Sequence, residues 1–176
     1  WVGRWSADDP SMFRALGWTH LLRAGRRDQL PELHEIEAEL DSLAPQTLWE
    51  WQAVLDLAAL INSNDRTREA VDGVISKSTY GEPVWLMAHE KGYHLAVSEA
   101  NDTSTLQFSK ALCEAQPGRL DYSEWYTQAL RKTGAWSELQ LFMEEQLESG
   151  LSDATTARGL IAESLFETGD DESGLE

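Results

Sequence analysis

Residues Pro45–Pro83 read PQTLWEWQAVLDLAALINSNDRTREAVDGVISKSTYGEP, and this stretch predicts two helices joined by a short turn. The first predicted helix covers about 47–64 and the second about 66–78. Apolar residues recur in both at steps of three and four, the spacing of one helix face. They are Trp49, Trp51, Val54, Leu57, Ala58 and Ile61, then Ala70, Val71, Val74 and Ile75. A single pair of helices cannot bury two such faces, so copies of the pair are expected on both sides.

The rest of the chain predicts those copies. Turns are expected at Gly25, Asp65, about Glu99, Gly134 and Gly169, a period of about 34 to 40 residues. The first pair has predicted helices at about 10–24 and 28–43, and the fifth has one at about 154–168. The predicted pairs span about 10–44, 45–82, 83–118, 119–151 and 152–176, and the last stops inside its second helix. Residues 1–9 are expected to be a linker or the remnant of a preceding helix.

Composition supports an all-helical globular chain. Of 176 residues, 41% are hydrophobic and 26% charged, which is typical of a folded domain rather than a disordered one. Long stretches consist of good helix formers, and no alternating run of β-branched residues predicts a strand. The fold class expected is all-α.

The chain is strongly acidic, with 31 acidic against 14 basic residues and a net charge of −17. Nucleic acid is disfavoured as a ligand because its binding depends on basic groups that meet phosphates. An anionic membrane surface is disfavoured for the same reason. The charge indicates either a simply solvated surface or a basic partner attracted by the field.

The cysteine count and the hydropathy of the chain exclude several further kinds of site and segment. Cys113 is the only cysteine, so an intrachain disulfide and a thiolate metal cluster are both excluded. No apolar run reaches the roughly 20 residues of a membrane span, and no membrane insertion is expected. The compartment stays open between bacterial periplasm and cytoplasm. The chain begins at Trp1, so we expect it to be part of a longer protein.

No catalytic or metal-binding spacing is found. His89 and His94 resemble a zinc-binding His-Glu-x-x-His pair, but they lie five residues apart and Tyr93 stands where the second ligand belongs. We expect a surface His89 and a partly packed His94. The chain lacks a Gly-x-Ser-x-Gly elbow, a glycine-rich phosphate loop and a Cys-x-x-Cys pair. We therefore predict a non-enzyme without catalytic residues, cofactor or metal.

Small and large residues alternate across the predicted pairs as in one known superfamily. They are Ala58, Ile61, Ala70 and Val74, then Gly92, Leu95, Phe108 and Ala111, then Leu130, Gly134, Trp136 and Leu139. In this pattern the chain resembles the tetratricopeptide repeat (TPR) superfamily over nearly its whole length. Lys91 departs from the pattern where a leucine is expected, and Trp18 where a small residue is expected. The resemblance implies an α-solenoid, a right-handed superhelix of about five pairs, with Sel1-like and HEAT-like repeats as alternatives.

The TPR resemblance also implies a groove lined by the first helix of each pair. The positions that match the family's groove positions are Thr19, Arg23, Gln52, Asn62, His89, Tyr93, Glu124, Gln128, Arg131 and Glu163. We call these ten residues the first-helix row. The row is mixed in sign and lacks the clamp of lysines and asparagines found in chaperone-tail receptors, which disfavours that subfamily.

Three functions remain as hypotheses. The first is a non-catalytic scaffold that binds a protein or peptide of basic character and assembles complexes. The second is a periplasmic scaffold in bacterial exopolysaccharide export, similar to the Pel-type system, which binds a cationic polysaccharide or its modifying enzyme. The third is a regulatory solenoid attached to an enzyme in a longer chain.

Overall fold

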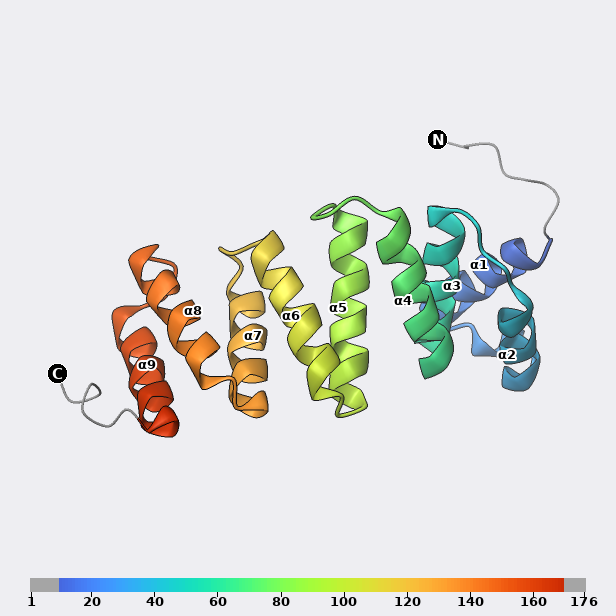
Figure 1. Cartoon of the computed structure of the whole chain (residues 1–176). Helices are drawn as coiled ribbons and strands as arrows, with labels where there is room; N and C mark the ends of the chain where they lie inside the picture. Colours follow the sequence, from blue (N-terminus) through green and yellow to red (C-terminus); the bar gives the residue numbers. More distant parts are fainter. Residues whose placement is uncertain (1–9, 170–176) are drawn as a thin grey trace. The chain divides into compact units, whose positions relative to one another are not determined.

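The computed structural model describes residues 10–169, which form helices joined by turns and loops and contain no strand (Figure 1). The predicted remnant at residues 1–9 and the second helix of the fifth pair lie outside this range. The helices are α1 (Pro10–Arg23), the 3-10 turn η1 (Arg27–Gln29), α2 (Leu33–Ser42), α3 (Leu48–Ile61), α4 (Asn64–Lys77), α5 (Pro83–Ser98), α6 (Asp102–Ala115), α7 (Leu120–Thr133), α8 (Trp136–Glu148) and α9 (Ala154–Thr168).

Helices that follow one another pack together in each of two compact bodies, which divide between Leu95 and Ala96. In the N-terminal body α3 packs against both α4 and α1, and α2 contacts α3. The predicted apolar faces meet there, with buried Val54, Leu55, Leu57 and Ala58 on α3 and Ala70, Val71 and Val74 on α4. The central stretch is thus the core of this body.

Local chemistry sets the ends of α3. The Thr47 backbone N–H donates to the Glu50 carboxylate at 2.8 Å and so satisfies a donor that the first turn leaves free. At the other end Asn62 takes a left-handed conformation, with φ 59°. The turn predicted at Asp65 therefore lies at Asn62 and Ser63, and Asp65 is in the first turn of α4. Asparagine tolerates this conformation better than most residues.

The second helix of the first pair is shorter than the predicted range of 28–43. A 3-10 turn at Arg27–Gln29 precedes a break, and α2 begins only at Leu33. Pro31 explains the difference, because the residue before a proline is pushed toward extended backbone. Leu30 is extended, with φ −95° and ψ 152°.

The C-terminal body repeats the same construction. In it α6 packs against α7, α7 against α8, and α8 against α9. Its fully buried side chains include Leu112, Tyr122, Leu130 and Leu139. Gly134 ends α7 and Gly169 ends α9, both with the left-handed backbone that favours glycine. The last helix occupies its predicted range.

Candidate functional site

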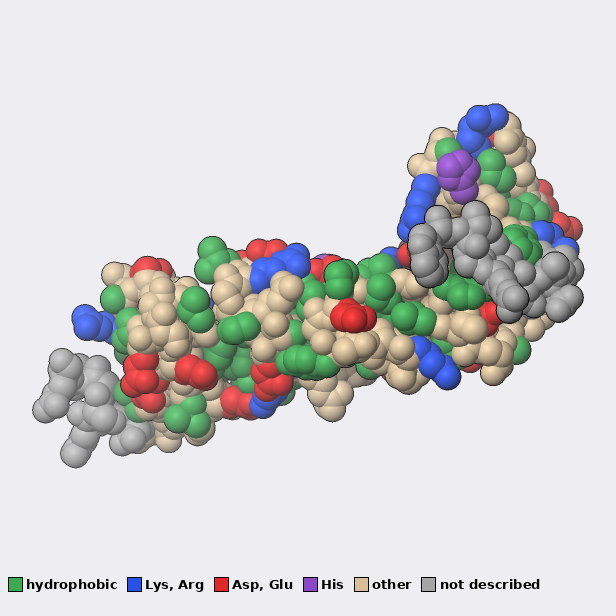
Figure 2. All heavy atoms as spheres, turned by 90° about the horizontal axis from the view of Figure 1, so that it is seen from above, with side chains coloured by type: hydrophobic (Ala, Val, Ile, Leu, Met, Phe, Trp, Pro, Cys, Tyr) green, Lys and Arg blue, Asp and Glu red, His purple; other side chains and the backbone are tan. Residues whose placement is uncertain are grey.

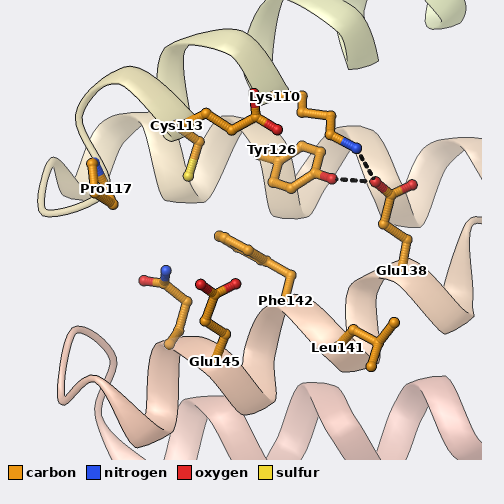
Figure 3. Close-up of a pocket in the computed structure, with 10 residues that line it drawn as sticks. Lys110, Cys113, Pro117, Tyr126, Glu138, Leu141, Phe142 and Glu145 are labelled. Atoms are coloured by element: carbon orange, nitrogen blue, oxygen red, sulfur yellow. Dashed lines mark hydrogen bonds and ion pairs between the residues drawn. The ribbon is translucent and has the colours of Figure 1, made fainter.

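The C-terminal body contains a pocket of about 430 Å³ among α6, α7 and α8 (Figure 3). Such a volume lies within the range of about 300–1,000 Å³ typical of small-ligand sites. We call it the α6–α8 pocket. It is lined by Lys110, Cys113, Glu114, Pro117, Tyr126, Glu138, Leu141, Phe142, Glu145 and Gln146.

One end of the pocket is closed by a polar cluster that joins the three helices. Lys110 of α6 and the Tyr126 hydroxyl of α7 both donate to the same oxygen of Glu138 on α8, each at 2.6 Å (Figure 3). These bonds lower the pKa of Glu138, chiefly through Lys110, and raise the pKa of Lys110. Glu138 is therefore a carboxylate and Lys110 a cation at neutral pH.

The wall of the pocket is aromatic and apolar. The rings of Tyr126 and Phe142 meet edge to face with centroids 4.9 Å apart. Cys113 lies beside them, buried, and burial raises the pKa of its thiol. A thiol held neutral in this way is a poor nucleophile, so Cys113 contributes packing rather than reactivity.

Several polar groups of the pocket have no partner in the described part of the chain. The carboxylates of Glu114 and Glu145 make no hydrogen bond or ion pair with any of residues 10–169. The Gln146 side chain makes none there either, although the residue is only 4% exposed. A buried amide ordinarily has a hydrogen-bond partner, so Gln146 offers unused donors and an unused acceptor to the pocket.

Charge at this end of the chain is mostly negative. Figure 2 shows acidic side chains gathered over the C-terminal helices on the face that it presents. The pocket itself has three carboxylates, Glu114, Glu138 and Glu145, against the single cation Lys110. This surplus of negative charge favours binding of a cationic group over binding of an anion.

Comparison with known proteins bears on the fold. No protein-family model matches the chain, and no curated protein sequence matches it. The chain is similar to the solved structure titled "MamA MSR-1 C2", a TPR-like helical repeat protein, with a TM-score of 0.54 and 16% sequence identity. The alignment covers 95% of this chain and 92% of that chain. The chain is a TPR-like α-solenoid.

In the N-terminal body, Arg23 of the first-helix row and Lys91 both form ion pairs with one aspartate of α3. Arg23 of α1 reaches the Asp56 carboxylate of α3 at 2.9 Å. Lys91 of α5 approaches the same carboxylate at 3.9 Å. The lysine that departs from the TPR pattern is thus an ion-pair partner between neighbouring first helices.

Three other members of the row in this body are buried. Thr19 is 5% exposed, and its hydroxyl donates to the Ala15 carbonyl one turn earlier, at 2.9 Å. His89 and Tyr93 are each 7% exposed. Little of the surface of these three side chains is therefore accessible to a ligand.

The two neighbouring histidines are placed opposite to expectation. His89, predicted at the surface, is buried with its ring stacked on Trp85, centroids 3.5 Å apart, and its Nδ1 2.9 Å from the Trp85 carbonyl. Burial lowers the pKa of His89. His94, predicted to be partly packed, is exposed. The prediction was wrong because both lie on α5 and the face buried there is that of Trp85, not that of His94.

The remaining members of the row are half-buried or exposed. Gln52 is half-buried on α3, and Asn62 caps α3 beside a second, apolar pocket of about 270 Å³. Gln128 donates to Glu124 at 3.1 Å on α7. Arg131 of α7 donates to Glu163 of α9 through Nε at 3.1 Å and Nη2 at 2.7 Å.

Sequence reasoning did not find the α6–α8 pocket, and none of the first-helix row lines it. Its residues come from α6 and α8, together with Pro117 in the loop after α6 and Tyr126 of α7. Lys110 and Glu138 are far apart in sequence, and only the packing of one pair on the next brings them together. No local spacing marks such a site.

Residues 10–169 lack two further kinds of site. That range holds no group of three or more His, Cys, Asp or Glu side chains placed to bind a metal ion. Nor does any helix within it have the length and apolar character that crossing a membrane requires.

Proposed function

We propose that this chain is a non-catalytic scaffold that binds a protein or peptide of basic character and assembles it into a complex. One observation carries the proposal: a TPR-like solenoid whose C-terminal body holds an apolar, acid-rimmed pocket with unused hydrogen-bonding groups. The net charge of −17 adds a field that attracts a basic partner. We also propose pair boundaries at about 10–44, 45–82, 83–118, 119–151 and 152–176.

The test is capture followed by measurement with purified components. The chain is immobilised, crosslinked to proteins of its source extract, and each specifically retained protein is then purified and titrated by calorimetry. We expect at least one partner that binds saturably and whose affinity falls as salt is raised, because basic partners are screened. Failure to find any saturable protein partner would contradict the scaffold proposal.

The two rival hypotheses have no specific support in the structure. A scaffold for exopolysaccharide export would bind a cationic oligosaccharide, and titration of a glucosamine oligomer against tryptophan fluorescence tests it. A saturable, salt-sensitive response to that oligomer without any protein partner would favour export over protein assembly. Regulation of an attached enzyme is tested by assaying the longer protein with and without this region.

A further inference from the structure

The α6–α8 pocket offers both apolar surface and carboxylates, the two features that the binding of a long cationic side chain requires. Apolar and aromatic surface for a hydrocarbon stem is supplied by Phe142, Leu141, Pro117 and Cys113. Glu145 and Glu114 supply unpaired carboxylates, and Glu138 keeps one oxygen that neither Lys110 nor Tyr126 contacts. Figure 3 shows Phe142 and Glu145 pointing from α8 toward the space beneath Cys113 and Tyr126.

Gln146 distinguishes this pocket from a patch of surface acids. Its side chain is almost completely buried, lines the pocket and has no partner among residues 10–169. Its amide has two N–H donors and an oxygen acceptor, so a ligand in the pocket can hydrogen-bond to it.

We propose that the α6–α8 pocket binds an arginine side chain of a partner protein. A guanidinium presents five N–H donors in one plane, and the pocket offers acceptors on Glu138, Glu145, Glu114 and Gln146. Aromatic surface next to carboxylates suits a guanidinium, which is weakly hydrated and stacks on rings. An anion is excluded because the only cation of the pocket, Lys110, is already bonded to Glu138.

This inference rests on the proposed scaffold function and specifies one contact of it. The site lies on second helices, α6 and α8, whereas the groove implied by the TPR resemblance lies on first helices. The two surfaces are therefore separable by substitution. Glu167 of α9 is exposed, does not line the pocket and is not a member of the first-helix row, so it provides a matched control for Glu145.

The probe is N-acetyl-arginine amide, titrated into the isotopically labelled chain while the Gln146 side-chain NH2 signals are followed by NMR. The citrulline analogue has nearly the same shape without the charge, and the lysine analogue has the charge without the planar fork. We expect saturable shifts of the Gln146 signals with the arginine probe, weaker binding of the lysine probe and no binding of the citrulline probe.

Two variants locate the site. Glu145 is exposed, so Glu145→Gln retains the fold, and we expect it to weaken binding of the arginine probe about threefold to fivefold. Glu167→Gln makes the same charge change at an exposed position of α9 and should leave the affinity unchanged. Equal weakening by both variants, equal binding of arginine and lysine probes, or no response of Gln146 would overturn the assignment. If the arginine probe does not bind but a saturable protein partner is found, this inference alone is refuted and the scaffold function is not.

Discussion

At the scale of single residues, Gly73 of α4 lies directly against the Trp51 ring of α3. A Cβ atom built on Gly73 would lie 2.2 Å from the Trp51 ring. Glycine within a helix normally costs about 1 kcal/mol relative to alanine, but here the missing side chain makes room for the indole. We expect Gly73→Ala to lower the free energy of unfolding by about 1–3 kcal/mol, the usual cost of overpacking, as measured by urea titration.

Gly159 is the matched control for that substitution. It lies inside α9, and a Cβ there would meet nothing within 4 Å. Gly159→Ala should therefore stabilise the chain by up to about 1 kcal/mol. If both alanine variants are stabilising, the close contact between Gly73 and Trp51 is absent in solution.

Ala100 has a backbone conformation that is unfavourable for any residue with a Cβ atom. It follows α5 with φ 53°, a left-handed conformation that costs a non-glycine residue about 1–2 kcal/mol. We expect Ala100→Gly to raise the free energy of unfolding by about 0.5–1 kcal/mol, measured by chemical denaturation. Ala162→Gly, on an exposed position inside α9, should lower it by about the same amount.

The same residues show why some turns were placed more closely than others. Gly134 and Gly169 both adopt positive φ at the positions where the sequence predicts turns. The turn predicted at about Glu99 lies at Glu99 and Ala100, and Ala100 has positive φ although alanine has no intrinsic preference for it. There the backbone N–H groups of Ala100 and Asn101 donate to the Val97 and Ala96 carbonyls, bonds that do not depend on the side chain and so leave no mark in the sequence.

At the scale of the helix, α5 contains a titratable group whose burial makes stability depend on pH. The pKa of His89 is lowered below its usual 6.5 by burial, so the folded chain binds a proton there less readily than the unfolded chain. Stability is then fully present above about pH 6.5 and decreases as the pH falls from 6.5 toward the lowered folded pKa. This site alone therefore lowers the thermal midpoint between pH 7.5 and pH 5.5, while the decreasing negative charge of the chain acts in the opposite direction.

His89→Gln isolates that contribution because glutamine does not titrate. The variant should lose less of its thermal midpoint than wild type over the same pH interval, whatever its stability at pH 7.5. His94→Gln, at an exposed position of the same helix, is the control for replacing a histidine of α5 outside the buried site. Identical pH dependence of wild type and His89→Gln would show that His89 is accessible to protons in the folded chain.

Glu138 joins α6, α7 and α8, and its loss should weaken the C-terminal body. Glu138→Gln removes the charge that accepts from Lys110 and Tyr126, and we expect a loss of about 1 kcal/mol at pH 7. Because the folded pKa of Glu138 is lowered, the difference from wild type is present above the unfolded pKa and disappears as the pH falls through the folded value. Urea titrations at several pH values measure it. Glu148→Gln, on the last turn of the same helix, should cost nothing.

Helix positions were predicted better than the contacts among helices. The range of α9 was predicted from its apolar spacing and the Gly169 signal, whereas α2 was predicted too long because Pro31 was not given its weight. The α6–α8 pocket needs Lys110, Tyr126 and Glu138 to meet at one point. Their meeting depends on how one pair packs on the next, which single-helix periodicity does not contain.

For the molecule as a whole, the repeat period was the informative signal. A solenoid is held by contacts between near neighbours in sequence, so its fold class follows from a regular pattern even when no pair carries a full consensus. The ligand does not follow in the same way. Arg23, Arg131 and Glu163 form ion pairs between α1 and α3 and between α7 and α9, and that they line a groove stays a prediction.

The net charge of −17 leads to a prediction for the whole chain. Like charges repel in the compact state, and salt screens that repulsion. We expect the thermal midpoint at pH 7.5 to rise when sodium chloride is raised from about 0.02 M to 0.5 M, where the Debye length falls from roughly 20 Å to 4 Å. The increase should shrink near pH 5, because this pH is close to the isoelectric point of about 4.5 and the net negative charge is smaller there. Ion pairs such as Arg131–Glu163 oppose the trend, since salt weakens them too. A midpoint that falls with salt at pH 7.5 would mean that these pairs between helices outweigh the repulsion among the surplus acids.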